Sequence, residues 1–290
     1  MVTVARSARL RLDASSREAL TRFLRHPRYE VLPTDEAEQL VTGHVPQEVT
    51  ITITSSPKRG IDATLALAER LRAQGYSVVP HLAARLVRDA VHLKEITARI
   101  DALGGSVFVV AGDSREAAGA YPDSVSLLTA IGEVAPHLKD IGVTGYPESH
   151  SFIDDDLTIQ AMWDKRRVAT YIVSNLCFDV RLVKKWVGRV RKRGVQLPIH
   201  IGIAGVTDPA KLLRVSTRIG ITDSARFLRG HSNWLMKMIQ PGGYEPGRFA
   251  ASLMPELALP ERNVAGFHVF TFNEVEPTER WRQDMLARMH

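Results

Sequence analysis

The sequence repeats one pattern along its length: a short apolar stretch of strand-forming residues, a polar or charged residue where that stretch stops, and then a helical stretch. Parallel strands that alternate with helices close into a (β/α)8 barrel, whose active site is built from the C-terminal ends of the strands. The sequence therefore predicts an α/β fold, a TIM barrel with its polar strand ends gathered at one mouth. The expected strands are residues 29–33, 49–54, 77–82, 106–113, about 141–145, 171–175, 197–203 and 266–273.

The length of the chain fits one such domain. A (β/α)8 barrel takes about 250 residues, and this chain has 290. Residues 1–27 precede the first strand, and we expect an arm followed by an extra N-terminal helix over residues 15–25, with Ser15 or Ser16 as the N-cap. Residues 1–290 are thus predicted to form a single barrel domain with that extension.

Composition limits the class of protein. A content of 44% hydrophobic and 24% charged residues is ordinary for a globular protein, and no stretch has the roughly 18 apolar residues that a membrane span needs. The N-terminus is interrupted by arginines and lacks the apolar region of a secretory signal. One cysteine, Cys177, allows no internal disulfide. We expect a cytoplasmic protein that does not bind a membrane.

Positive charge is concentrated in one segment, residues 181–193. Apolar residues recur in it at helical spacing, which predicts a helix with a basic outer face. A solvated face is the plain interpretation, and a site for an anionic ligand tail is the alternative. The one aromatic residue of this segment, Trp186, belongs to its apolar face and not to the charged one, so no nucleic-acid partner is expected.

Glu30 is the unusual residue of the first expected strand. A carboxylate within an apolar strand is costly unless it is paired or used. Burial would raise its pKa and make it a general acid, whereas the alternative is a salt bridge inside the barrel.

Other polar or aromatic side chains end the remaining strands. Asp113 follows Gly112, a residue that would let a ligand approach the backbone, although a helix-capping role for Asp113 is the alternative. Asn175 offers an amide suited to an amide or aminopyrimidine edge. The other predicted residues of the mouth are His81, Tyr146, Glu148 and His150.

These residues leave two kinds of site open. His81, Asp113, Glu148 and His150 could bind a catalytic divalent metal, as in a barrel hydrolase, although the first strand lacks a His-x-His pair. Alternatively, the mouth could bind an aromatic heterocycle, with Tyr146 and Phe272 stacking on it and Glu30 as the acid.

Six motifs together resemble the methylenetetrahydrofolate reductase family over roughly residues 28 to 275. The most specific are Tyr-Pro-Glu-x-His on the fifth strand, Gly-Asp on the fourth, and His-x-x-Thr-x-Asn on the eighth. The motifs lie at residues 29–33, 80–82, 112–113, 146–150, 175–179 and 267–273.

The resemblance implies reduction of 5,10-methylenetetrahydrofolate to 5-methyltetrahydrofolate, a step of methionine supply, with hydride that originates on NADH or NADPH. Glu30 matches the acid that protonates folate N10 and opens the ring to a 5-iminium cation. Asp113 matches an aspartate near the pterin, which makes Glu30 and Asp113 the predicted catalytic residues. Asn175, in place of the family's usual glutamine, is assigned with Tyr146 and His81 to substrate binding. The residues assigned to cofactor binding are His150, Thr54, Ser55 and Glu148.

The departures from the family lie around the flavin. The arginine before Gly-Asp is Ala111, the glycine-rich turn after the second strand reads Ser55-Ser-Pro-Lys-Arg59, and a loop phenylalanine is replaced by Pro209. We therefore expect resemblance to the flavin-independent branch, in which hydride passes directly to the folate, rather than to an FAD-dependent ping-pong enzyme. The substrate would be a reduced folate, in a polyglutamylated form if the basic helix binds the tail. A folate-binding barrel without catalysis remains an alternative, and a corrinoid-linked methyltransferase is disfavoured because no cobalamin-binding extension is present.

Overall fold

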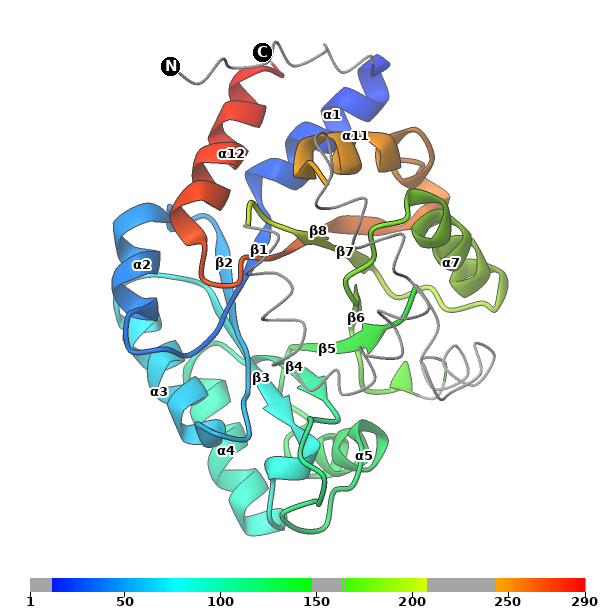
Figure 1. Ribbon diagram of the computed structural model, residues 1–290. Coiled ribbons are helices and arrows are strands. Elements are labelled where there is room, and N and C mark those ends of the chain that lie inside the picture. Colours follow the sequence, from blue (N-terminus) through cyan, green and yellow to red (C-terminus); the bar gives the residue numbers. More distant parts are fainter. Residues whose placement is uncertain (1–11, 148–162, 164, 208–243, 290) are drawn as a thin grey trace.

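Eight parallel strands form a closed barrel in chain order, with each strand next to its sequence neighbours and β8 against β1 (Figure 1). The computed structural model describes residues 12–147, 163, 165–207 and 244–289. The strands are β1 (Arg28–Val31), β2 (Thr50–Ile53), β3 (Val78–Ala83), β4 (Ser106–Val110), β5 (Asp140–Gly145), β6 (Tyr171–Ser174), β7 (Ile199–Ala204) and β8 (Val264–Phe270). The predicted TIM barrel is confirmed.

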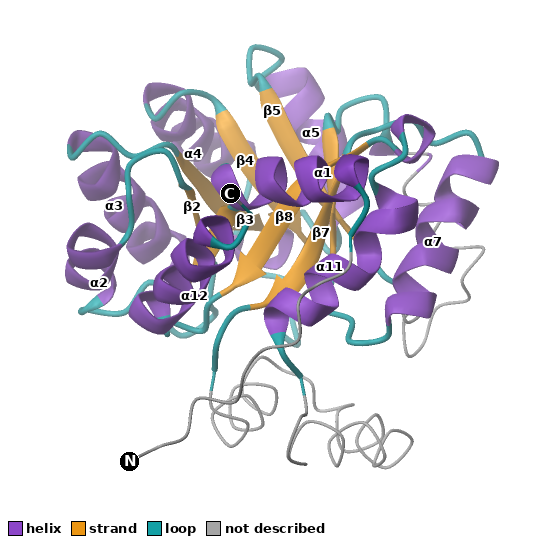
Figure 2. Cartoon of the chain, turned by 90° about the horizontal axis from the view of Figure 1, so that it is seen from above, coloured by secondary structure: helices purple, strands orange, loops and turns teal. Residues whose placement is uncertain are grey.

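Helices surround this ring of strands (Figures 1 and 2). Within the described residues they are α1 (Ala14–Arg25), α2 (Ala37–His44), α3 (Gly60–Ala73), α4 (Ala90–Ala102), α5 (Ser124–Val134), α7 (Val180–Lys192), α11 (Pro246–Leu257) and α12 (Val275–Ala287), with two 3-10 turns, η1 (Ala84–Leu86) and η2 (Pro260–Arg262). None of the described helices has the length and apolar character needed to cross a membrane.

Carboxylates begin most of the longer helices. The side chains of Asp13, Asp89, Asp123 and Asp179 each accept a hydrogen bond from a backbone N–H of the first turn. The extra N-terminal helix is therefore confirmed, but its predicted cap was wrong: Asp13, and not Ser15 or Ser16, is the N-cap. An ionised carboxylate also interacts favourably with the helix dipole there.

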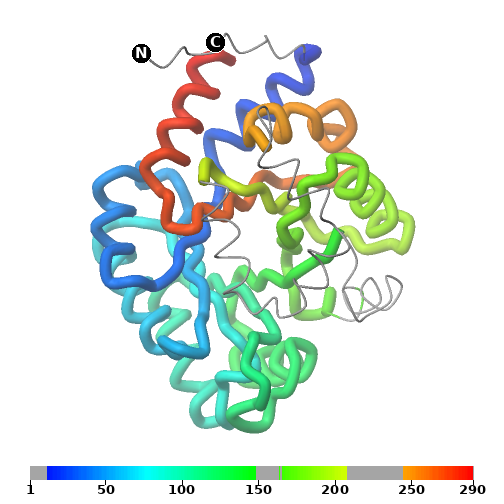
Figure 3. The backbone as a smooth tube through the Cα atoms, viewed as in Figure 1, coloured from blue at the N-terminus to red at the C-terminus, as the bar shows by residue number. Residues whose placement is uncertain are grey.

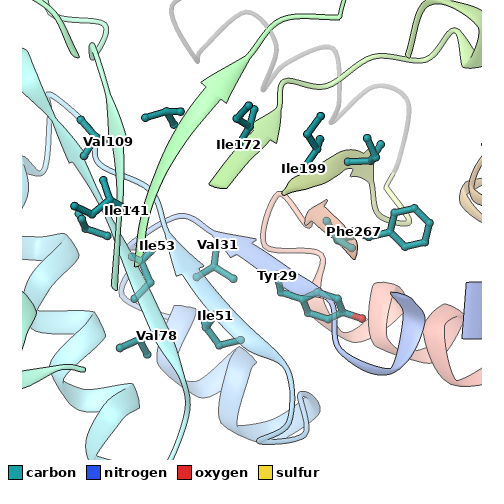
Figure 4. Packing of buried hydrophobic residues seen from close by; sticks show 14 of the residues in the cluster. Tyr29, Val31, Ile51, Ile53, Val78, Val109, Ile141, Ile172, Ile199 and Phe267 are labelled. Carbon is teal, nitrogen blue, oxygen red and sulfur yellow. The ribbon is translucent and has the colours of Figure 1, made fainter. Parts of the chain in front are cut away.

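Alternation along the strands separates two sets of side chains. One set packs between the strands and the helices and forms the main apolar core, of which Tyr29, Ile51, Ile172 and Phe267 are labelled in Figure 4. The other set points into the barrel. Its apolar part is small, with Val79, Phe108, Tyr171 and Val173 as buried members. Polar side chains therefore make up much of the remaining barrel interior, where a site can form.

The first and last described helices meet at one side of the barrel. Helices α1 and α12 contact each other, and both lie together in the tube of Figure 3. A buried network joins them to β1: Tyr29 donates to Glu279 at 2.9 Å, Arg282 binds Glu279 through two nitrogens, and Arg282 also donates to the carbonyl of Leu24. The network fixes β1, and with it the residue that follows Tyr29.

Candidate active site

Glu30 points into the barrel, because its neighbour Tyr29 points outward to Glu279 of α12. The same alternation turns His268 of β8 inward, since Phe267 packs against Phe23 of α1 with ring centroids 5.3 Å apart. His81 of β3 is also inward, with its ring 4.8 Å from that of Phe108. Three strands thus bring Glu30, His81 and His268 together.

Glu30 and the two histidines form one ionisable cluster. The Nε2 atom of His268 is 2.9 Å from Oε2 of Glu30, and Nε2 of His81 is 3.9 Å from the same oxygen. The side chain of Glu30 keeps 16% of its surface exposed, whereas His81 and His268 keep 6% and 1%. Glu30 is therefore the member of the cluster whose side chain keeps the most exposed surface.

The expectation for the pKa of Glu30 was wrong in direction. Burial does act to raise this pKa, but the hydrogen bond with His268 and the charges of His81 and His268 outweigh burial and hold it below the ordinary glutamate value. Burial lowers the pKa of His81 to about 4, only partly offset by Glu30. Glu30 is thus paired inside the barrel, and its lowered pKa favours the carboxylate form.

The His-x-x-Thr-x-Asn motif of β8 holds the end of β1. Thr271 donates its hydroxyl to the carbonyl of Glu30 at 2.6 Å. Asn273 accepts from the N–H of Leu32 and donates to its carbonyl, at 2.8 and 3.2 Å. Asn273 has a left-handed backbone with φ of 60°, a conformation that asparagine tolerates better than most residues. The sequence analysis used this motif for the resemblance but assigned no role to His268, Thr271 or Asn273.

Asp113 and Tyr146 lie near each other after β4 and β5. Asp113 is exposed in the mouth, yet the surrounding protein raises its pKa by desolvation, with a smaller opposing effect of Arg85. Burial and the charge of Asp113 raise the pKa of the Tyr146 phenol. The alternative capping role for Asp113 was wrong, because Asp123 caps α5.

Gly112 has a different reason for being glycine from the one expected. Its φ is 90°, and a Cβ atom there would lie 2.9 Å from Cβ of Ala83. Close packing of the β4 end on β3, together with the left-handed backbone, requires glycine. This packing sets the direction in which the chain presents Asp113.

Other predicted residues occupy the ends of β2 and β6. The hydroxyls of Thr54 and Ser55 are buried and have no hydrogen-bond partner in the described part of the chain. Asn175 is exposed, and its Oδ1 accepts from the N–H of Leu176. The amide nitrogen of Asn175 is the side-chain group available to a ligand there.

Glu148 and His150 lie outside the described residues, as does Pro209. Among the residues that the structure describes, no group of three or more His, Cys, Asp or Glu side chains is arranged to hold a metal ion. The metal-site alternative therefore gains no support from His81 and Asp113.

The position of the family's flavin-binding arginine supplies no cation in this chain. Ala111 occupies it, and the carbonyl of Ala111 accepts a hydrogen bond from the N–H of Arg85. The guanidinium of Arg85 donates to the carbonyls of Pro122 and Ser114. These residues do not fit FAD in the way that the resemblance describes.

The basic helix α7 packs by Val183, Trp186 and Val187 and carries its charges on the other side, as predicted. Arg191 is not free for a ligand, because its guanidinium donates to the carbonyls of Arg262, Val195 and Asn263. In a (β/α)8 barrel, the helix that follows a strand starts at the active-site face and runs away from it. The basic residues of segment 189–193 lie at the C-terminal end of α7, and therefore at the face of the barrel opposite the mouth.

Sequence reasoning also missed a second polar group inside the barrel. Arg28 forms an ion pair with Asp140 at 3.2 Å, and its guanidinium lies 4.1 Å from the centre of the Tyr171 ring. His200 meets the same ring edge-on at 5.5 Å. These residues fill the barrel around Tyr171, and the alternation of inward side chains was the signal that could have predicted them.

The fold is that of a TIM-barrel protein, and the carboxyl of Glu30 lies beside His81 and His268 inside the barrel. A sequence profile of the family described as Methylenetetrahydrofolate reductase matches residues 30–226. The chain belongs to the methylenetetrahydrofolate reductase family, as the motifs had indicated.

Similar proteins support the family and the fold separately. Methylenetetrahydrofolate reductase 1 of Schizosaccharomyces pombe (strain 972 / ATCC 24843) is 33% identical over 101 residues, which cover 33% of this chain and 17% of that protein. The match thus spans about a sixth of the curated relative.

Among solved structures, a protein of Toxoplasma gondii ME49 assigned as a deoxyribose-phosphate aldolase has 11% identity and a TM-score of 0.51, over 94% of this chain and 97% of that chain. This likeness shows the fold alone. Tryptophan synthase from M. tuberculosis has 12% identity and a TM-score of 0.49, with 97% and 98% of the two chains covered.

Proposed function

We propose that this protein reduces 5,10-methylenetetrahydrofolate to 5-methyltetrahydrofolate, with hydride taken from NADH or NADPH. Membership of the family supports the substrate class. The observation that carries the proposal is the carboxyl of Glu30, held between His81 and His268 with part of its surface open to the mouth. That carboxyl is the acid that ring opening of the folate requires.

The residues have distinct tasks in this reaction. Glu30 gives a proton to N10, the C–N10 bond opens, and the remaining 5-iminium cation accepts hydride at its methylene carbon. Asp113, whose desolvation strengthens its interactions with nearby charge, stabilises that cation. Asn175, Tyr146 and His81 contact the substrate.

We further infer that hydride reaches the folate directly, without flavin. Ala111 and the hydrogen bonds of Arg85 support this, because the flavin-binding cation of the resemblance is missing there. The nicotinamide would then occupy the mouth next to the folate, in contact with Thr54, Ser55, Glu148 and His150. Both reactants bind at once, so proximity supplies much of the rate.

Deuterium transfer separates direct reduction from an FAD-dependent ping-pong reaction. With NADH deuterated at the transferred position, direct transfer keeps deuterium in the product methyl group, whereas the N5 hydrogen of a reduced flavin exchanges with water. We expect a colourless protein, retained deuterium, and intersecting lines in two-substrate kinetics. A yellow protein with washed-out label and parallel lines would establish the FAD mechanism. Folate binding without NADH oxidation would point to a binding protein.

The substrate class includes polyglutamylated folates. Because the basic residues of segment 189–193 lie at the end of α7, away from the mouth, we expect the polyglutamate tail to bind elsewhere on the protein. The buried thiol of Cys177, the single cysteine, is compatible with the cytoplasm, which we propose as the compartment.

A further inference from the structure

His268 is the nearest partner of the residue on which the proposed reaction depends. Its Nε2 lies 2.9 Å from Oε2 of Glu30, and the ring is 1% exposed. Aromatic rings confine it: the ring of Phe270 lies edge-on at 4.9 Å and that of Phe108 at 6.3 Å. The imidazole can therefore reorient little once the barrel has formed.

The same strand also holds the backbone of Glu30. The hydroxyl of Thr271 donates to the carbonyl of Glu30, and Asn273 binds both backbone groups of Leu32. Residues from β8 thus fix the main chain on which Glu30 stands as well as one oxygen of its carboxyl group. The rotation of that carboxyl group is consequently restricted.

The surroundings of His268 indicate where its proton lies. Nδ1 is buried and has no hydrogen-bond partner among the described residues. A proton on Nδ1 would be a buried, unsatisfied donor and would leave the Nε2 lone pair facing a carboxylate oxygen. We therefore assign the proton of the neutral ring to Nε2, from which it is donated to Oε2 of Glu30.

We propose that His268 is a positioning residue for Glu30: it holds Oε2, leaves Oε1 for the substrate, and stabilises the carboxylate that remains after proton transfer. The inference rests on the proposed function. In that step the Oε1–H bond breaks, an N10–H bond forms, and the C–N10 bond then breaks with its electron pair kept on N10. Glu30 becomes a carboxylate, and its hydrogen bond from His268 becomes charge-assisted.

The hydrogen bond between His268 and Glu30 also affects the protonation of N10, the base in this step. N10 is attached to an aromatic ring and is weakly basic, so each proton transfer to it is less unfavourable from a stronger acid, while a lower pKa also reduces the fraction of Glu30 that carries a proton at a given pH. Burial raises the pKa of Glu30, and the hydrogen bond from His268, with the charges of His81 and His268, more than reverses that effect. Among the described residues, His81 and His268 are the ionisable groups that act on the Glu30 carboxyl.

The test compares two amides of different reach. In His268→Gln the side-chain nitrogen lies as many bonds from Cβ as Nε2 does, whereas in His268→Asn it corresponds to Nδ1 and falls short of Glu30. Both variants place a neutral polar group at the same site, so they are matched for the cost of burial. The titration of Glu30 is followed by ¹³C NMR of side-chain carboxyls, with the signal assigned from Glu30→Gln.

We expect Glu30 to titrate in His268→Gln close to the wild type, and about one pH unit or more higher in His268→Asn. Since Glu30 must carry its proton to act as the acid, kcat/KM falls as the pH rises through its pKa, and this alkaline limb should move with it. Equal titration of Glu30 in the wild type and both variants would overturn the proposal, as would an unmoved pH profile in His268→Asn. The NMR measurement needs no turnover: a shifted titration in a protein that does not reduce folate would refute the proposed function and leave the His268–Glu30 interaction established.

Discussion

At the scale of single residues, the proton on Glu30 separates binding from chemistry. Glu30→Gln keeps the size of the side chain and an acceptor for His268, but it removes the proton that ring opening needs. We expect kcat to fall about 10²- to 10⁴-fold while the affinity for the folate changes little. Steady-state kinetics and equilibrium folate binding measure the two effects, and a parallel loss of binding would show a structural role.

A substitution at Gly112 tests whether the packing at the end of β4 requires glycine. Gly112→Ala forces a left-handed backbone on alanine and a Cβ contact of 2.9 Å with Ala83. We expect a loss of about 1–3 kcal/mol in the free energy of unfolding and lower activity, since Asp113 follows.

Gly43→Ala is the matched control, because a Cβ there meets nothing within 4 Å. In helix α2 this change should be neutral or stabilising by up to about 1 kcal/mol in urea unfolding. Similar losses in both variants would contradict the role given to packing at Gly112.

At the scale of elements, β8 and α12 decide where β1 lies. The segment that follows β8 holds it through Thr271 and Asn273, and α12 holds it through the buried pair of Glu279 and Arg282. Helix α12 binds the outward side chain of Tyr29, and the segment after β8 binds the backbone of β1 at Glu30. Glu30 thus obtains its position from contacts made about 240 residues later in the sequence, as with the separation of 241 for Thr271.

The pair in α12 gives a direct prediction. Glu279→Ala leaves Arg282, which is 1% exposed, with the half-exposed Glu48 at 3.8 Å as its remaining carboxylate partner among the described residues, and it removes the acceptor of Tyr29. We expect a loss of about 3–5 kcal/mol in the free energy of unfolding. Glu276→Ala on the same helix removes an exposed ion pair with Arg280 and should cost less than about 0.5 kcal/mol. Chemical denaturation of both variants measures this contrast, and comparable losses would refute it.

At the scale of the whole molecule, buried histidines make stability depend on pH. The native pKa of His81 is about 4, against an ordinary value of 6.5, and burial also lowers that of His200. Between these values the unfolded chain binds a proton that the native protein does not. The stability that these neutral histidines contribute is therefore fully present above about pH 6.5 and is lost as the pH falls toward 4.

We expect His81 alone to contribute about 2 kcal/mol of the loss between pH 7.5 and 5. Urea unfolding at several pH values measures it. His81→Gln should flatten the dependence by that amount, and His44→Gln, at an exposed position of α2, is the matched control. An equal slope in the wild type and His81→Gln would show that His81 titrates normally in the native protein.

The barrel itself was predictable because its causes are local. Apolar strands alternate with amphipathic helices, and each polar strand end is visible in the sequence. The same local pattern identified Glu30, His81 and Asp113 as inward or mouth residues, and it failed for Arg28, Tyr171 and His200, which lie in or beside stretches assigned to strands without regard to which face they occupy.

The sequence by itself determined the order of strands and helices, the family, and the residue types available for chemistry, because each depends on spacing along the chain. Only the tertiary structure decided which of those residues meet. His268 beside Glu30, and the lowered pKa that results, follow from β8 closing against β1, a contact between the two ends of the barrel. Burial alone was the effect that the sequence could suggest for Glu30. The hydrogen bond that reverses it exists only after the ring of strands has closed.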